Sequence, residues 1–134
     1  MNNQQRAENA IKWIETLLKT RMKQGKGELG NSKRGYCCLG VGCKVLGVNY
    51  DPDEASDKDF SESVGLWDEE GRAYDSEQDK PISAWVLGHE ALTALNDDVQ
   101  FTFNQIAKRL ISQTDEYFKP EVAKLIKKHF EEKQ

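Results

Sequence analysis

Residues 35–47, GYCCLGVGCKVLG, constrain this chain most, because they hold all three of its cysteines and four of its ten glycines. Apolar side chains recur in this segment at intervals of three and four residues, which is the spacing that buries one face of an α-helix. Gly47 follows the last of them and is typical of a helix end. We therefore expect a buried helix, in which Gly40 and Gly42 let the backbone of another segment approach closely.

The cysteines of this segment allow a structural and a catalytic interpretation. Cysteines often serve as small apolar residues of a core. A thiol of Cys37 or Cys38 at a helix N-terminus would instead have a lowered pKa, and His89 with a later Asn-Asp pair follows in the order found in some cysteine hydrolases. Adjacent cysteines lack the C-x-x-C spacing of structural zinc sites. We expect packing residues, no metal and no cofactor, and keep a cysteine-dependent hydrolase or transferase using Cys38 and His89 as the alternative.

Helical patterns dominate the rest of the 134-residue chain. Apolar spacing, capping signals and proline positions predict further helices over residues 5–23, over 81–88, from Phe103 and from Pro120. Residues 24–35 are rich in glycine and are expected to form a loop, and residues 51–63 are too polar for a core. Two apolar pieces around an Asp-Glu-Glu-Gly turn predict a β-hairpin over residues 64–74. The sequence therefore predicts one α+β domain over residues 1–134, dominated by helices, with a small β-hairpin or antiparallel sheet.

The net charge of −4 is unevenly distributed along the sequence. Residues 1–50 carry nine basic and three acidic side chains, residues 51–100 three basic and fifteen acidic, and residues 101–134 seven basic and five acidic. The basic first part favours an anion site, whereas the acidic middle would repel a nucleic-acid duplex. The acidic segment 51–79 is either a solvated loop or a surface that docks on a host protein. The odd cysteine count, with no export signal and no apolar stretch of membrane-spanning length, predicts a cytoplasmic protein.

Two longer stretches of sequence resemble a known group of proteins. Residues 11–47 carry a tryptophan helix, a Q-G-x-G-x-L loop and a C-C-L-G-V-x-C segment, and residues 92–111 carry L-N-D, a short turn and an F-x-x-I-A helix. In this order, the motifs resemble small, mostly uncharacterised proteins of bacteriophages and bacteria. Relatives often have a glycine turn where this chain has Val99 and Gln100. The resemblance implies a phage context and carries no established activity.

Within that context, the sequence predicts an accessory protein that binds and sequesters a phosphate-bearing small molecule, most plausibly a nucleotide-derived immune signal of a bacterial defence system. The cysteine helix would form a floor that holds the basic loop 24–34 against the loop 95–101, with Trp67 and Trp85 as further stacking faces. The candidate ligand-binding residues are Gln24, Gly25, Lys26, Gly27, Lys33, Arg34, Asn96, Asp97 and Phe101. The alternatives are the cysteine enzyme and an inhibitor that docks on a host protein. The oligomeric state is left open, a homo-oligomer included.

Overall fold

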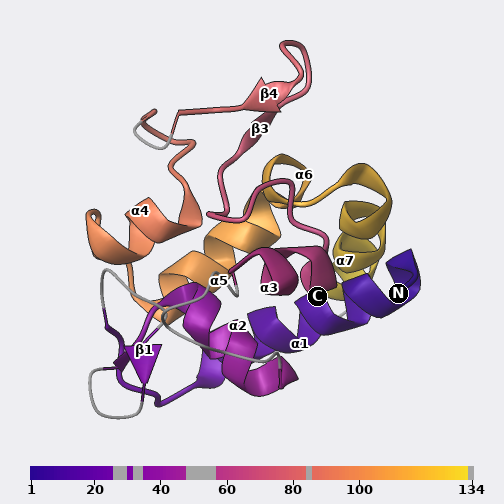
Figure 1. Cartoon of the computed structure of the whole chain (residues 1–134). Coiled ribbons are helices and arrows are strands. Elements are labelled where there is room, and N and C mark those ends of the chain that lie inside the picture. Colours follow the sequence, from indigo (N-terminus) through magenta and orange to yellow (C-terminus); the bar gives the residue numbers. More distant parts are fainter. Residues whose placement is uncertain (26–29, 32–34, 48–56, 84–85, 133–134) are drawn as a thin grey trace.

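The computed structural model describes residues 1–25, 30–31, 35–47, 57–83 and 86–132. Helices dominate this part of the chain, and two small antiparallel sheets accompany them (Figure 1). The helices are α1 (Asn3–Lys19), α2 (Cys38–Leu46), α3 (Asp57–Val64), α4 (Leu92–Asp97), α5 (Phe103–Ser112), α6 (Thr114–Tyr117) and α7 (Pro120–Glu132). The strands are β1 (Gly30–Asn31), β2 (Gly35–Tyr36), β3 (Tyr74–Asp75) and β4 (Lys80–Pro81). The expected helix-dominated α+β fold is confirmed.

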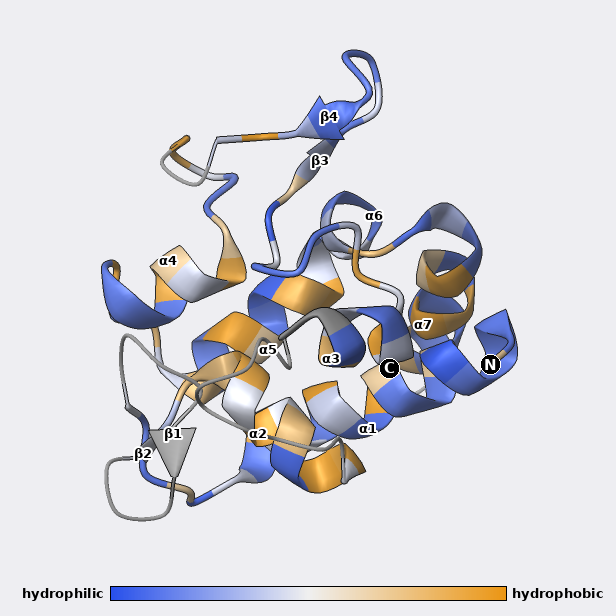
Figure 2. Ribbon diagram, in the orientation of Figure 1, coloured by the Kyte–Doolittle hydropathy of each residue, from blue (hydrophilic) through white to orange (hydrophobic). Residues whose placement is uncertain are grey.

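Helix α1 is the centre of the packing. A capping box between Asn2 and Gln5 starts it two residues before the predicted boundary, and it ends at Lys19 rather than at residue 23. It packs against α2, α3, α5 and α7 (Figure 1), and its ribbon carries both hydrophobic and hydrophilic residues (Figure 2). The buried residues of α1 are Ala7, Ala10, Trp13, Ile14 and Leu17. The apolar stripe therefore drives α1 into the core, as its 3.6-residue spacing predicts.

The cysteine segment forms the predicted buried helix α2, and Gly47 ends it with a φ of +69°. The expected reason for its interior glycines needs correction at Gly42. A Cβ atom there would lie 2.2 Å from the ring of Phe60, so an aromatic side chain and not a backbone approaches it. Phe60 is fully buried and meets Trp13 edge to face, with 4.9 Å between ring centroids. The absence of a side chain at Gly42 thus makes room for an aromatic pair.

Helix α3, which contains Phe60, also corrects the expectation that residues 51–63 stay out of the core. Residues 51–56 lie outside the described part of the chain, but α3 spans Asp57–Val64 and buries both Phe60 and Val64 completely. The polar composition of residues 51–63 concealed Phe60, and Val64, four residues later on the same helix face, had been assigned to the predicted hairpin.

The hairpin predicted over residues 64–74 is wrong in its position. Leu66 instead pairs with Phe118, and the carboxylate of Asp68 accepts hydrogen bonds from the N–H groups of Glu70 and Arg72, which bends the chain into a turn. A hairpin forms farther along the chain instead, where β3 pairs with β4, and it projects from the helices (Figure 1). A partner distant in sequence thus replaced the local pairing.

The helix expected over residues 81–88 is also wrong. Pro81 belongs to β4, and the N–H of Ile82 donates to Ala73 O at 2.7 Å, which continues the strand pairing. Residues 84–85 lie outside the described part, and turns follow from Val86 to His89. Here sheet pairing overrides a proline that is equally suited to start a helix.

Helices α5 and α7 follow the prediction closely. The capping box of Thr102 and Gln105 starts α5 at Phe103, where Ile106 and Leu110 are buried and Ile111 is half-buried. Helix α7 starts at Pro120 and buries Val122, Ala123 and Ile126. The short helix α6 was not predicted. The segment Leu95-Asn96-Asp97, which was expected in a loop, forms the last half of α4.

Candidate functional site

The two sequence motifs meet through the side chain of Asn96. Gln24 Nε2 donates to Asn96 Oδ1 at 2.8 Å and to the backbone oxygen of Phe101 at 2.7 Å. Asn96 Nδ2 in turn donates to Gly25 O at 2.8 Å. The first residues of the glycine-rich loop are therefore held against the end of α4 and the turn that follows it, which is the juxtaposition that the sequence predicted.

Asn96 is fully buried and uses its whole hydrogen-bonding capacity inside the protein. Its Oδ1 also accepts from the N–H of Cys38 at 3.2 Å, and its Nδ2 also donates to Asp97 Oδ1 at 2.8 Å. An amide side chain has two acceptor positions and two donor positions, and all four are occupied here. Asn96 thus joins the loop, α4 and the start of α2, whose first N–H groups have no partner within the helix.

Gly35 fixes the other side of the same loop. The N–H of Gly25 donates to Tyr36 O at 2.8 Å, and the N–H of Tyr36 donates to Lys23 O at 2.7 Å. Gly35 has a φ of +91°, and a Cβ atom on it would lie 2.8 Å from both Gln24 C and Gly25 N. Only glycine fits such a backbone crossing. Gly35 therefore allows two backbone segments to approach each other closely.

The cysteines fit the packing interpretation. Cys37 caps α2, because its Sγ accepts from the N–H of Gly40 at 3.3 Å. Cys38 is fully buried, its Sγ lies 3.6 Å from Leu92 O, and its carbonyl accepts from Trp13 Nε1 at 2.9 Å. All three thiols are free and buried.

The thiol that the enzymatic alternative requires is not activated. Burial raises the pKa of Cys38 well above its ordinary value, and the nearby thiol of Cys37 and carboxylate of Asp97 raise it further. Cys38 therefore lacks the lowered pKa that the enzymatic alternative requires of its nucleophile. His89, the proposed partner of Cys38, instead contacts Glu116, with 3.0 Å between His89 Nδ1 and Glu116 Oε1.

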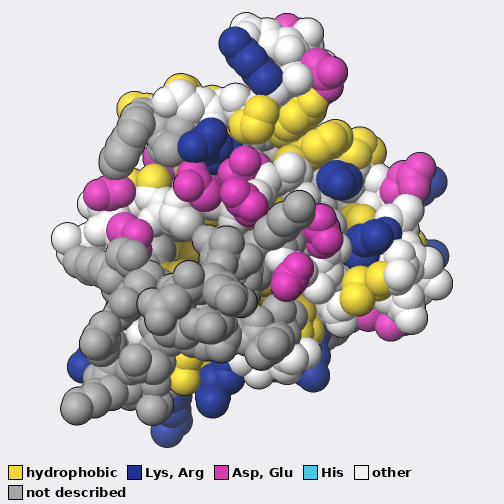
Figure 3. All heavy atoms as spheres, in the orientation of Figure 1, with side chains coloured by type: hydrophobic (Ala, Val, Ile, Leu, Met, Phe, Trp, Pro, Cys, Tyr) yellow, Lys and Arg dark blue, Asp and Glu magenta, His cyan; other side chains and the backbone are white. Residues whose placement is uncertain are grey.

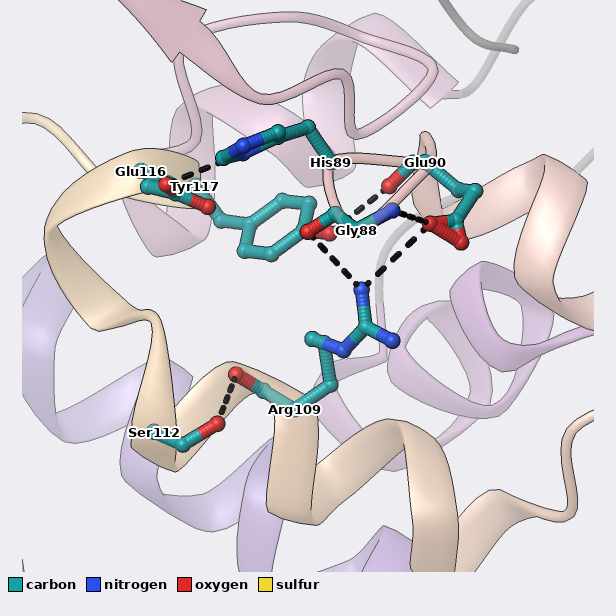
Figure 4. A network of polar contacts seen from close by, with 7 residues as sticks. All are labelled: Gly88, His89, Glu90, Arg109, Ser112, Glu116 and Tyr117. Carbon is teal, nitrogen blue, oxygen red and sulfur yellow. Dashed lines mark hydrogen bonds and ion pairs between the residues drawn. The ribbon is translucent and has the colours of Figure 1, made fainter. Parts of the chain in front are cut away.

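A second polar network adjoins the motif loops at Phe101. The guanidinium carbon of Arg109 lies 5.3 Å from the centroid of the Phe101 ring. Arg109 Nη1 also donates to Gly88 O at 3.3 Å and lies 3.7 Å from Glu90 Oε1, as Figure 4 shows. The same carboxylate oxygen accepts from the N–H of Gly88, and Tyr117 Oη donates to Glu90 O at 2.7 Å. Arg109 thus links the turn at Gly88 to the aromatic ring beside the motif loops.

Sequence reasoning missed this network. Arg109 and Tyr117 lie within helical patterns, and Glu90 follows the segment that was wrongly predicted as a helix. Glu90 is only 7% exposed, which is rare for a carboxylate without a partner. Burial raises the pKa of Tyr117 to about 12. No spacing signal connected these residues, because they come together through the tertiary fold.

The candidate residues fall into two groups. Gln24, Gly25, Asn96, Asp97 and Phe101 are brought together at the base of the basic loop. Lys26, Gly27, Lys33, Arg34 and Trp85 lie outside the described residues. Trp67 stacks on Tyr74 at 4.0 Å between ring centroids, so its described ring contact is with the base of the hairpin. Within the described part of the chain, no cluster of three histidine, cysteine or acidic side chains could hold a metal ion.

Comparison with known proteins finds no matching family model, curated protein or solved structure.

Among the described helices, none has both the length and the apolar character needed to cross a membrane. Several acidic side chains lie below the projecting hairpin on the face of the molecule shown in Figure 3.

Proposed function

We propose that this protein binds and sequesters a phosphate-bearing small molecule, and that the molecule is a nucleotide-derived signal of a bacterial defence system. The observation that carries the proposal is the buried network of Asn96, which holds the base of a basic, glycine-rich loop in one position. A site whose base is held in place binds its ligand at a lower entropic cost. In this proposal the protein acts in the cytoplasm of the bacterial host and needs no cofactor.

The roles of the candidate residues differ within this site. Lys26, Lys33 and Arg34 would neutralise the phosphate, and Gly27 would let backbone N–H groups approach it. Gly25, whose own N–H donates to Tyr36 O, would let the loop pass close to the ligand. The ring of Phe101, half-buried beside Arg109, would stack on a base. Asn96 is a positioning residue, because its four hydrogen bonds are made within the protein. Gln24 Oε1 makes no hydrogen bond to the described part of the chain and is the acceptor left for the ligand.

A thermal-shift screen with cyclic dinucleotides and NAD-derived cyclic nucleotides tests the proposal. A ligand at about 100 times its dissociation constant stabilises the folded state by about 2.7 kcal/mol. For a domain of this size, that raises the melting temperature by roughly 10 °C. K26A and R34A should reduce the shift and its dependence on salt, because each removes a cation that meets the phosphate.

The matched control is K124A, which removes an exposed lysine of α7. It should leave the ligand-induced shift unchanged. A screen with no hit, or a hit that K26A and R34A bind as well as the unaltered protein does, would refute the sequestration proposal. An inhibitor that docks on a host protein through the acidic segment 51–79 would then be the better hypothesis.

A further inference from the structure

An open groove of about 640 Å³ runs along the exposed face of α1. Four charged side chains of α1 line it, Glu8, Lys12, Glu15 and Lys19, together with Ile11 and Thr16. Positions separated by four, three and four residues lie on one helix face, so the charges form a single stripe of alternating sign. The stripe is about 16 Å long at 1.5 Å per residue.

This stripe is complementary to itself when it is reversed. The midpoint between Glu8 and Lys19 is the same as the midpoint between Lys12 and Glu15, and it lies between Trp13 and Ile14. A two-fold axis at that point would set Glu8 of one copy against Lys19 of the other, and Lys12 against Glu15. Each opposite-charge pair would occur twice, as in any interface that pairs one surface patch with itself.

The contacts that the described residues make with these side chains are compatible with a second copy of α1. Lys12 and Lys19 are exposed, and neither makes an ion pair with the described part of the chain. Glu15 Oε1 lies 3.0 Å from His129 Nε2, and Glu8 Oε1 accepts from Gln4 Nε2 at 3.3 Å. A carboxylate has about four acceptor positions, so a contact with one partner does not prevent a second contact with a lysine.

We infer that the groove along α1 is a dimer interface, in which α1 of a second copy packs antiparallel. The charge stripe sets the orientation, because parallel pairing of the two helices in register would place like charges opposite each other. The half-buried Ile11 side chains of the two copies would lie on one side of the contact. The apolar area is small, so the dimer is weak and sensitive to salt.

Sedimentation equilibrium between about 10 and 500 μM at low salt tests the inference. The unaltered protein should dimerise within this range. K19E should raise the dissociation constant about tenfold, because two attractive contacts become repulsive. The reciprocal swap E8K/K19E should restore dimerisation. K108E, the same substitution at an exposed lysine of α5, should change nothing.

A mixing experiment distinguishes a lost contact from a variant that fails to fold, because only folded variants can regain dimerisation when they are combined. E8K/E15K has a stripe of lysines, K12E/K19E has a stripe of glutamates, and the two should associate only with each other. Circular dichroism of each variant checks that the helices are retained. A monomer at every concentration would overturn the inference. The inference would also be overturned if E8K/K19E dimerised no better than K19E. The same holds if K108E raised the dissociation constant of the dimer as much as K19E does.

Discussion

Removal of the Asn96 side chain gives the clearest test of how the motif loops are held together. In N96A, the buried N–H of Cys38 and the carbonyl of Gly25 lose their partners, and Gln24 Nε2 keeps only its bond to Phe101 O. An unsatisfied buried polar group costs about 1–3 kcal/mol. With one such group at Cys38, and with the bonds of Asn96 to Gly25 and Gln24 also lost at about 1 kcal/mol each, N96A should lower the free energy of unfolding by about 3 kcal/mol and the melting temperature by roughly 10 °C.

Asn104→Ala is the matched control for this substitution. Asn104 also lies in a helix, but its side chain makes one hydrogen bond to the described residues, from Nδ2 to Leu18 O at 3.2 Å. The two variants share the same change in helix propensity, so the difference between them measures the additional bonds of Asn96. N104A should cost about 1 kcal/mol. Urea unfolding of both proteins measures the difference, and an N96A cost no larger than that of N104A would refute the reasoning.

Three further substitutions test other parts of the structure. C38S should destabilise the protein by about 1–3 kcal/mol more than C38A in thermal unfolding, because a hydroxyl is more costly to bury than a thiol. A C38A protein that folds but does not bind the nucleotide would argue for a reactive thiol. Q100G should keep or slightly raise the melting temperature, because Gln100 has a φ of +62°, and a clear loss would contradict the strain argument. The pKa of Tyr117 is raised to about 12 in the folded state, so its neutral hydroxyl stabilises the folded protein fully below pH 10. As the pH rises to 12, the free energy of unfolding should fall by about 2–3 kcal/mol. Y117F should lack this loss in alkaline unfolding curves.

Local signals in the sequence predicted the helices that carry them. The capping box at Thr102 fixed the start of α5, and Gly47 fixed the end of α2, because these residues act on neighbouring backbone groups. The hairpin was misplaced because Leu66 pairs with Phe118, which is distant in sequence. Spacing within one segment carries no information about such a partner.

The candidate site was predicted only in part, because some of its contacts join segments that are distant in sequence. The two motifs indicated that Gln24 and Asn96 lie together, and the structure adds how they bond. Periodicity could not show that Asn96 is fully buried, since asparagine is usually exposed. The link from Phe101 through Arg109 to Glu90 joins three segments and has no sequence signature.

The fate of a bound nucleotide tests the central claim most directly. The protein is incubated with a hit from the thermal-shift screen, freed of unbound ligand and then denatured by heat, and the released molecule is identified and quantified by chromatography and mass spectrometry. Sequestration predicts that the intact nucleotide is recovered, at about one molecule per site, after any length of incubation. Conversion of the nucleotide to a product, or no retained nucleotide at concentrations well above the dissociation constant, would contradict the account.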